Sequence, residues 1–196
     1  MNQLPASITM GNIFFTSDHH FGHANIIRFC NRPFADVEAM DRELIRRWNE
    51  KIQPGDTVYH LGDFALNGAE AFAAIAEQLN GNIHLIAGNH EASALNHRKR
   101  FAWIKDYYEL KVKDPSCANG VQRIVLLHYA MRTWRGAHRG TWHLYGHSHN
   151  TLPDWEESLS FDVGVDCHDF YPLSYEEVKA VMQRKNWTPP FGIEER

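Results

Sequence analysis

Short apolar runs recur along the chain, and each of them stops abruptly at polar residues. Continuous apolar runs bounded by turn residues are typical of buried strands. We therefore predict strands over 13–16, 57–61, 83–86, 107–113, 121–127, 141–145 and 159–165. Helices are predicted over 25–30, over 37–51 with Asp36 as N-cap, and over 69–79. A capping box from Ser174 to Glu177 begins a last helix that is expected to reach about residue 185.

Strands that alternate with helices indicate an α/β domain. The chain has 196 residues, of which 43% are hydrophobic and 22% charged, as is ordinary for a globular domain with a full core. We expect one domain over residues 1–196. The net charge of −4 disfavours a chain-wide basic surface for nucleic acid, although a local basic patch stays open.

The three cysteines, Cys30, Cys117 and Cys167, are widely spaced and form no C-x-x-C pair. This spacing disfavours a disulfide framework and a cysteine zinc site, and it fits a reducing cytoplasm. Residues 1–12 lack the basic start and apolar core of a signal peptide, and no apolar run is long enough for a membrane span. We predict a cytoplasmic protein without a membrane partner.

The polar residues that follow the predicted strands share one chemistry. Five strands end at a residue of metal-ligand type: Asp18, Asp63, Asn89, His128 and His147. Because α/β sheets bind ligands in the crevice beyond the carboxyl ends of their strands, these side chains are expected to meet in one crevice. His20 and His149 lie two residues beyond Asp18 and His147, and they extend the set to seven candidates.

Seven candidate ligands are too many for one zinc ion, which takes three or four protein ligands. Two divalent ions that share a bridging carboxylate fit the set better. A set of oxygen and nitrogen donors without a thiolate suits Mn²⁺, Fe²⁺, Zn²⁺ or Ni²⁺, and Mn²⁺ is our first choice. The positive charge that two divalent ions keep after their carboxylate ligands are counted would attract a phosphate. Two ions roughly 3.5–4 Å apart can also hold the attacking and the leaving oxygen of an in-line displacement.

The sequence resembles the calcineurin-like metallophosphoesterases in five strings that follow the family's order. These strings are Ser17-Asp18-His19-His20, Gly62-Asp63, Gly88-Asn89-His90-Glu91, His128 and Gly146-His147-Ser148-His149. The run from Thr16 to Ile27 is also similar to a small bacterial and phage subgroup of predicted phosphoesterases. The resemblance implies two mixed β-sheets packed as a sandwich and flanked by helices, in the four-layer α/β/β/α order of that family.

The resemblance also implies a role for each matching residue. One metal ion would be held by Asp18, His20 and His149, the other by Asn89, His128 and His147, with Asp63 as the bridge. A hydroxide between the ions would attack the phosphorus. His90 would donate a proton to the leaving oxygen, and Glu91 would orient His90. Glu91 stands where the family more often has aspartate, so its side chain is one methylene longer.

Some residues near the motifs have two interpretations that the sequence leaves open. His23 is a candidate for contact with substrate phosphate or with a metal ligand, whereas His19 is expected to be structural. The stretch 131–141 contains His138 and three arginines, Arg132, Arg135 and Arg139. It is either a loop that overhangs the site and grips phosphate with its guanidinium groups, or a solvated surface loop.

The sequence thus predicts a dinuclear metal-dependent phosphoesterase that acts on small phosphomonoesters or phosphodiesters, nucleotides included. A nuclease that acts on DNA or RNA is the second hypothesis, since the three arginines favour it and the acidic balance does not. A metal-binding scaffold without activity is the third. The presence of His90 and of all seven candidate ligands disfavours the scaffold.

Overall fold

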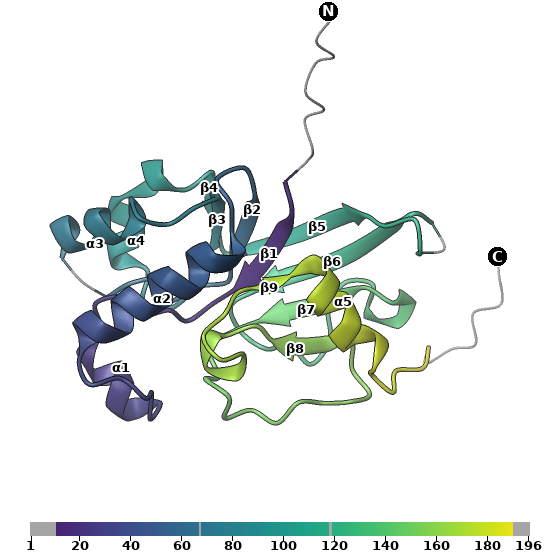
Figure 1. The fold of residues 1–196 in the computed structure, drawn as a ribbon. Coiled ribbons are helices and arrows are strands. Elements are labelled where there is room, and N and C mark those ends of the chain that lie inside the picture. Colours follow the sequence, from purple (N-terminus) through teal and green to yellow (C-terminus); the bar gives the residue numbers. More distant parts are fainter. Residues whose placement is uncertain (1–10, 67, 118, 190–196) are drawn as a thin grey trace, which may run out of the picture.

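The structure is a computed structural model, and it describes residues 11–66, 68–117 and 119–189. Two sheets form its centre (Figure 1). The first sheet has the strand order β4-β3-β2-β1-β9. Its strands are β1 (Ile13–Thr16), β2 (Thr57–His60), β3 (Asn82–Ile86), β4 (Trp103–Lys105) and β9 (Leu173–Ser174). The first four are parallel, and β9 pairs with β1 in the antiparallel sense.

The second sheet has the order β5-β6-β7-β8. Its strands are β5 (Tyr107–Lys113), β6 (Val121–Leu127), β7 (Trp142–Tyr145) and β8 (Ser160–Asp162). Strands β6, β7 and β8 are parallel, whereas β5 is antiparallel to β6. Both sheets are therefore mixed, which confirms the predicted architecture of two mixed sheets with flanking helices.

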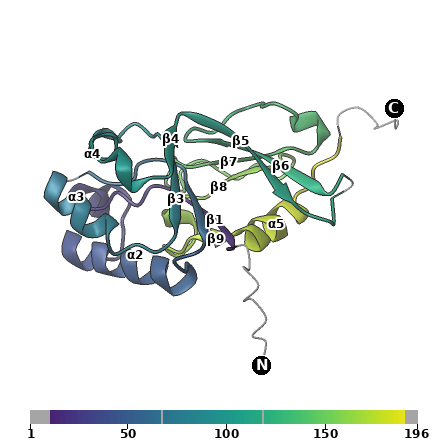
Figure 2. The same ribbon diagram turned by 90° about the horizontal axis from the view of Figure 1, so that it is seen from above.

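The helices are α1 (Ala24–Phe29), α2 (Val37–Lys51), α3 (Ala69–Ala76), α4 (Ala92–Asn96) and α5 (Tyr175–Gln183). Three short 3₁₀ turns, η1 (Arg98–Arg100), η2 (Ala137–Arg139) and η3 (Val165–Cys167), complete the described elements. Figure 1 shows α1 to α4 gathered on the side of the first sheet, and Figure 2 shows α5 beside β1 and β9. No helix within the described ranges is both long and apolar enough to cross a membrane.

Alternate residues of β1 divide the core into two parts. Phe14 packs with the helical side, in a cluster that includes Trp48 of α2 and Phe72 of α3. Phe15 faces the other way, into a cluster with Leu126 of β6 and with residues of α5. Successive side chains of a strand point to opposite faces, so a strand whose two faces are both covered is apolar throughout. This explains the unbroken apolar run that predicted β1.

Most predicted elements agree with the structure to within a few residues. Asp36 does cap α2, since its carboxylate accepts a hydrogen bond from the Ala39 amide at 2.7 Å. The predicted capping box of α5 is present in full. The helix predicted over 69–79 ends early at Ala76, and the last predicted strand, 159–165, is interrupted after Asp162 by the turn η3. The prediction of one domain over 1–196 stays a prediction.

Candidate metal centre

Loops beyond the carboxyl ends of β1, β2 and β7 are joined to one another by backbone hydrogen bonds. The amide of Asp18 donates to the carbonyl of Gly62 at 2.9 Å, and the amide of His20 donates to that of Asp63 at 3.0 Å. From the second sheet, the amide of His147 donates to Oδ2 of Asp18 at 2.9 Å. These hydrogen bonds connect the loops of the two sheets and hold Asp18, His20, Asp63 and His147 close together.

Five of the seven candidate ligands have left-handed backbones. Their φ angles are 59° at Asp18, 52° at His20, 54° at Asp63, 70° at His147 and 45° at His149. A non-glycine residue in a sparsely populated backbone region costs roughly 1–3 kcal/mol and persists only where its surroundings enforce it. Such residues cluster at functional sites. The clustering of left-handed residues at these positions supports a functional site. The hydrophobic periodicity of the sequence does not indicate which residues have left-handed backbones.

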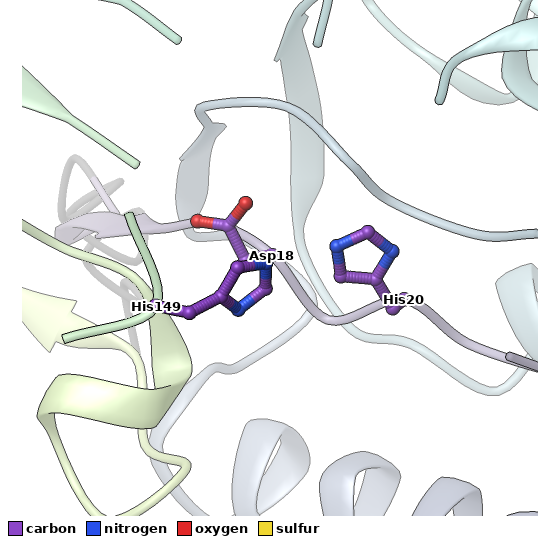
Figure 3. Close-up of side chains that lie close together, drawn as sticks. All are labelled: Asp18, His20 and His149. Carbon is purple, nitrogen blue, oxygen red and sulfur yellow. The ribbon is translucent and has the colours of Figure 1, made fainter. Parts of the chain in front are cut away.

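The first group of candidate ligands combines two loops. Asp18 and His20 come from the loop after β1, and His149 comes from the segment after β7 (Figure 3). One ligand atom from each of these three residues lies within 4.8 Å of one from each of the others. Asp18 and His20 are fully or almost fully buried, whereas His149 is half-buried. The group has the donors and the spacing of a site for one cation.

The second group lies alongside the first. Ligand atoms of Asp63, His128 and His147 also lie within 4.8 Å of one another. Oδ1 of Asn89 is 3.2 Å from Nε2 of His128, so the amide oxygen of Asn89 borders this group. Oδ2 of Asp63 is 3.7 Å from Nε2 of His128 and 3.4 Å from Nε2 of His20. The Asp63 carboxylate therefore lies between the two groups, where a bridging ligand would be.

Unpaired buried atoms support a cation at these groups. Oδ1 of Asp18 and both ring nitrogens of His20 are buried and have no hydrogen-bond partner among the described residues. Buried polar groups are normally hydrogen-bonded, and an unpaired one calls for an explanation such as an ion. Nδ1 of His128 donates to the Leu61 carbonyl at 2.7 Å, which leaves the lone pair of Nε2 directed away from that bond. The residues present therefore fit divalent cations.

Burial also sets the charge states of two candidate ligands. Burial raises the pKa of Asp18 to about 7, although the nearby His149 and the hydrogen bond from Ser17 oppose this shift. Burial lowers the pKa of His20 to about 2, and the positive potential of His149 and Arg32 acts in the same direction. His20 is thus neutral, as a metal-ligating imidazole must be. A cation would compensate the buried Asp18 carboxylate, which the protein alone leaves poorly solvated.

Arg32 and Asp166 connect to the first group, and the sequence did not single them out as site residues. The Arg32 side chain is fully buried, and it forms two hydrogen bonds of 2.8 Å with the Asp166 carboxylate. It also donates to the carbonyls of Asp18 at 2.7 Å and His19 at 2.9 Å. Asp166 in turn accepts from Nδ1 of His149 at 2.6 Å. Burial lowers the pKa of His149, but the hydrogen bonds to Asp166 and Cys30 and the negative charges of Asp18 and Asp166 together outweigh this effect and raise the pKa to about 10.

A rival grouping shares two of these residues. Cys30, His149 and Asp166 also place one ligand atom each within 4.8 Å of one another. However, Arg32 already neutralises Asp166 through two hydrogen bonds, which is unfavourable for a cation at that carboxylate. The Asp18 carboxylate, in contrast, accepts no hydrogen bond from an arginine or lysine side chain among the described residues. We therefore favour the group of Asp18, His20 and His149.

His90 lies beside the ligand groups, and the hydrogen bonds of the Glu91 carboxylate go to other residues. The His90 amide donates to Oδ1 of Asp63 at 2.9 Å, and its ring centre lies 5.6 Å from that of His20. Oε1 of Glu91 instead accepts from the amides of Phe64 at 3.1 Å and Gly88 at 3.4 Å. No hydrogen bond joins Glu91 to His90 within the described residues. Glu91 therefore ties together the loops after β2 and β3, and burial raises its pKa to about 7.

The two histidines flanking His20 have different surroundings. His19 is fully buried, and its Nδ1 lies 3.0 Å from Nε2 of the equally buried His60. It also packs edge-on against Trp48 of α2, so it is placed in the core as expected. His23 is half-buried, with its ring centre 5.4 Å from that of His20 and 6.4 Å from that of His90. His23 thus remains at the edge of the candidate site.

The structure does not bring Arg135 and Arg139 to this place. Arg135 is paired with Glu109 at 3.0 Å, and Arg135 and Arg139 line a separate cavity of about 540 Å³. That cavity includes Thr141, directly before β7, whereas His147 follows the opposite end of β7. Arg132 and His138 are exposed. The loop therefore runs along the second sheet, and Arg135 and Arg139 lie away from the ligand groups.

Comparison with known proteins agrees with this geometry. Residues 11–182 match the family described as calcineurin-like phosphoesterase. An uncharacterized protein of Methanocaldococcus jannaschii is 32% identical over 184 residues, which cover 90% of this chain and 94% of that protein. The Gene 66 protein of Mycobacterium phage D29 is 29% identical over 188 residues, or 84% of this chain and 93% of that protein.

A crystal structure of a protein of unknown function from Aquifex aeolicus has the same fold. It superposes with a TM-score of 0.66 at 24% identity and covers 87% of this chain and 99% of that one. The match over residues 11–182 spans both sheets and every candidate ligand. The family generally binds two divalent metal ions, and the two ligand groups described above are consistent with this. The chain belongs to the calcineurin-like phosphoesterase family, whose members are metal-dependent hydrolases of phosphoric esters.

Proposed function

We propose that this protein hydrolyses small phosphomonoesters or phosphodiesters, nucleotides included, with two divalent ions bound side by side. The observation that carries the proposal is the Asp63 carboxylate, 3.4 Å from His20 and 3.7 Å from His128, between the two ligand groups. Asp18, His20 and His149 would hold one ion, and Asn89, His128 and His147 the other. Asp63 would contact both.

The donor set favours Mn²⁺ in this proposal. Carboxylate and amide oxygens together with imidazole nitrogens, without a thiolate, suit borderline divalent ions, and Fe²⁺, Zn²⁺ and Ni²⁺ remain candidates. The ions would supply positive charge for the phosphate and lower the pKa of bound water. Asp18 and Asp63 would cancel only part of the ions' charge, so the site would keep its attraction for an anionic ester.

Other residues of the protein would position the substrate and protonate its leaving group. His90 borders the first ligand group and is half-buried, so it can reach a leaving oxygen and give it a proton. Glu91 would act indirectly, because its contacts hold the loops that present Asp63 and Asn89. His23 would contact the phosphate from the outer edge of the site.

Hydrolysis of bis-p-nitrophenyl phosphate in the presence of Mn²⁺ tests the proposal. Asp63→Asn and His128→Ala should each reduce kcat/KM at least 100-fold. Asp169→Asn and His138→Ala are matched controls, because both change exposed residues outside the ligand groups and should leave the rate within twofold. Equal rates for wild type and Asp63→Asn would contradict a bridging role for Asp63 and the proposal with it.

A panel of phosphomonoesters, cyclic nucleotides and oligonucleotides would identify the substrate class. We expect small esters to be turned over faster than oligonucleotides, because the net charge is −4 and two of the three candidate arginines lie away from the ligand groups. Salt dependence separates the nuclease alternative, since contacts to a phosphate backbone make binding fall steeply with salt concentration. Preferred cleavage of oligonucleotides with such a slope would favour a nuclease.

A further inference from the structure

A cavity of about 400 Å³ adjoins the second ligand group. It lies between the segments that follow β6 and β7, and its lining residues are Tyr129, Ala130, Gly146, His147, Ser148, Thr151 and Leu152. His147 belongs both to this wall and to the group with Asp63 and His128. The cavity therefore adjoins the place where the phosphate of a substrate would bind.

The chemistry of the wall differs from that of the ligand groups. The lining contains no aspartate, glutamate, lysine or arginine. The hydroxyl of Ser148 donates to Asp162, and that of Thr151 donates to the Ser148 carbonyl, so both hydroxyl protons are already used within the protein. What remains open to a ligand is mainly apolar and aromatic surface. Such a wall would leave the charge of a second phosphate uncompensated, which is costly, whereas it would accept an uncharged group.

Two large apolar side chains of the lining are unusually exposed. Tyr129 is 44% exposed and Leu152 is 46% exposed. The Tyr129 ring stands edge-on to the rings of His128 and His147, with centres 4.9 and 4.8 Å away. These contacts fix the ring beside the ligand group while leaving much of its surface uncovered. A rigid aromatic surface of this kind suits a flat ring that stacks on it.

We propose that this cavity binds the organic part of the substrate and that this part is an uncharged aromatic ring system, such as the base of a nucleotide. The inference rests on the proposed function, because it takes the phosphate to bind at the two ligand groups. A volume of about 400 Å³ lies at the small end of ligand pockets, which measure roughly 300–1,000 Å³. Tyr129 and Leu152 would determine specificity without contacting the reacting atoms.

Adenosine 5′-phosphate and ribose 5-phosphate form a matched pair of substrates for the test. The ester bond is the same primary one in both, and only the base differs. With Mn²⁺ bound, wild type should show a kcat/KM at least tenfold higher for the nucleotide, chiefly through a lower KM. Tyr129→Ala and Leu152→Ala should each lower the ratio of kcat/KM for the nucleotide to kcat/KM for the sugar phosphate at least fivefold.

Leu95→Ala is the matched control for Leu152→Ala. Leu95 lies on α4, is 45% exposed and does not line the cavity. Its substitution removes the same atoms at the same exposure, and it should change neither substrate. Equal effects of Leu152→Ala on both substrates, or no preference of wild type for the nucleotide, would overturn the inference while leaving the phosphoesterase proposal intact.

Binding of adenosine to the metal-free protein separates the two proposals. Isothermal titration should detect adenosine binding to wild type, at least fivefold weaker binding to Tyr129→Ala, and no detectable binding of ribose. Adenosine binding that depends on Tyr129, in a protein that hydrolyses no ester, would support the cavity and contradict the proposed function. Hydrolysis without any adenosine binding and without a nucleotide preference would support the proposed function and contradict the cavity proposal.

Discussion

Oδ2 of Asp166 lies 2.6 Å from Nδ1 of His149, although 17 positions separate the two residues in the chain. Because a ring nitrogen that donates to a carboxylate carries its proton there, this bond leaves Nε2 of His149 for a metal ion. Arg32 holds both carboxylate oxygens of Asp166 through two hydrogen bonds of 2.8 Å. Asp166, itself held by Arg32, thus fixes the orientation of the His149 ring through Nδ1.

Asp166→Asn should weaken one of the two metal sites. The substitution keeps the shape of the side chain but removes the charge that holds the imidazole, and loss of such a partner typically costs about 10–100-fold in metal affinity. Isothermal titration with Mn²⁺ and elemental analysis would measure affinity and stoichiometry. Asp169→Asn is the control, because it changes an exposed carboxylate three residues later. Unchanged affinity for both ions would show that Asp166 does not position His149.

Arg32→Lys should destabilise the fold. A lysine ammonium cannot reproduce the paired hydrogen bonds to Asp166 together with those to the Asp18 and His19 carbonyls. Hydrogen bonds to charged groups contribute about 1.5–3 kcal/mol each, and urea denaturation should show a loss of at least that order in the free energy of unfolding. Arg42→Lys, at an exposed position of α2, should change it by less than about 0.5 kcal/mol.

His90→Gln should retain metal ions but lose turnover. Glutamine fills similar space but cannot donate a proton to a departing alkoxide, and general acid catalysis contributes typically about 10²–10⁴-fold. The loss should grow as the leaving group becomes more basic, because a poor leaving group depends most on protonation. Rates for a series of aryl and alkyl phosphates would measure this trend. An equal loss across the series would mean that His90 is not the acid.

Gly62→Ala should disrupt the site far more than Gly120→Ala. Both glycines have positive φ, of 102° and 64°, so both substitutions strain the backbone. Only at Gly62 would the added Cβ collide with neighbours, at 2.4 Å from Nδ1 of His128 and 2.9 Å from Cα of Gly88. At Gly120 it would meet nothing within 4 Å. We expect Gly62→Ala to lower the melting temperature and Mn²⁺ affinity, whereas similar losses in both variants would contradict this.

Asp114→Asn should remove a pH-dependent part of the stability. Lys179 holds the pKa of Asp114 below its usual range, helped by hydrogen bonds from Tyr175 and Ser116. A lowered pKa means that the stabilisation is present above the unfolded pKa and is lost as pH falls through the folded one. Melting temperatures of wild type and variant should therefore differ at pH 7 and converge below about pH 4. A constant difference across this range would contradict the charge-based account.

The strand-end pattern was sufficient to predict most of the candidate site. It selected Asp18, Asp63, Asn89, His128 and His147, and the structure brings all five beside or into the two ligand groups. The sequence left the loop with Arg135 and Arg139 open between the site and the surface, since a run of cations between two strands has no period that places it in space, and the structure places both arginines at a separate cavity. Glu91 was expected at His90 and instead contacts Phe64 and Gly88.

The sequence by itself determined where most of the buried strands lie, because burial on both faces of a strand leaves a continuous apolar run in the chain. It did not determine β4 and β9, which are short edge strands whose pairing partners are distant in the sequence. Nor did apolar periodicity divide the strands between two sheets; that expectation came from the family resemblance.

Only the tertiary structure decided how the candidate ligands are held. The left-handed backbones at five of them, the buried guanidinium of Arg32 and the bond from Asp166 to His149 leave no local pattern in the sequence. Arg32 and Asp166 are 134 positions apart. A hydrogen bond depends on the distance between two groups in space. Residues so far apart in the chain come within that distance only after the two sheets have packed together.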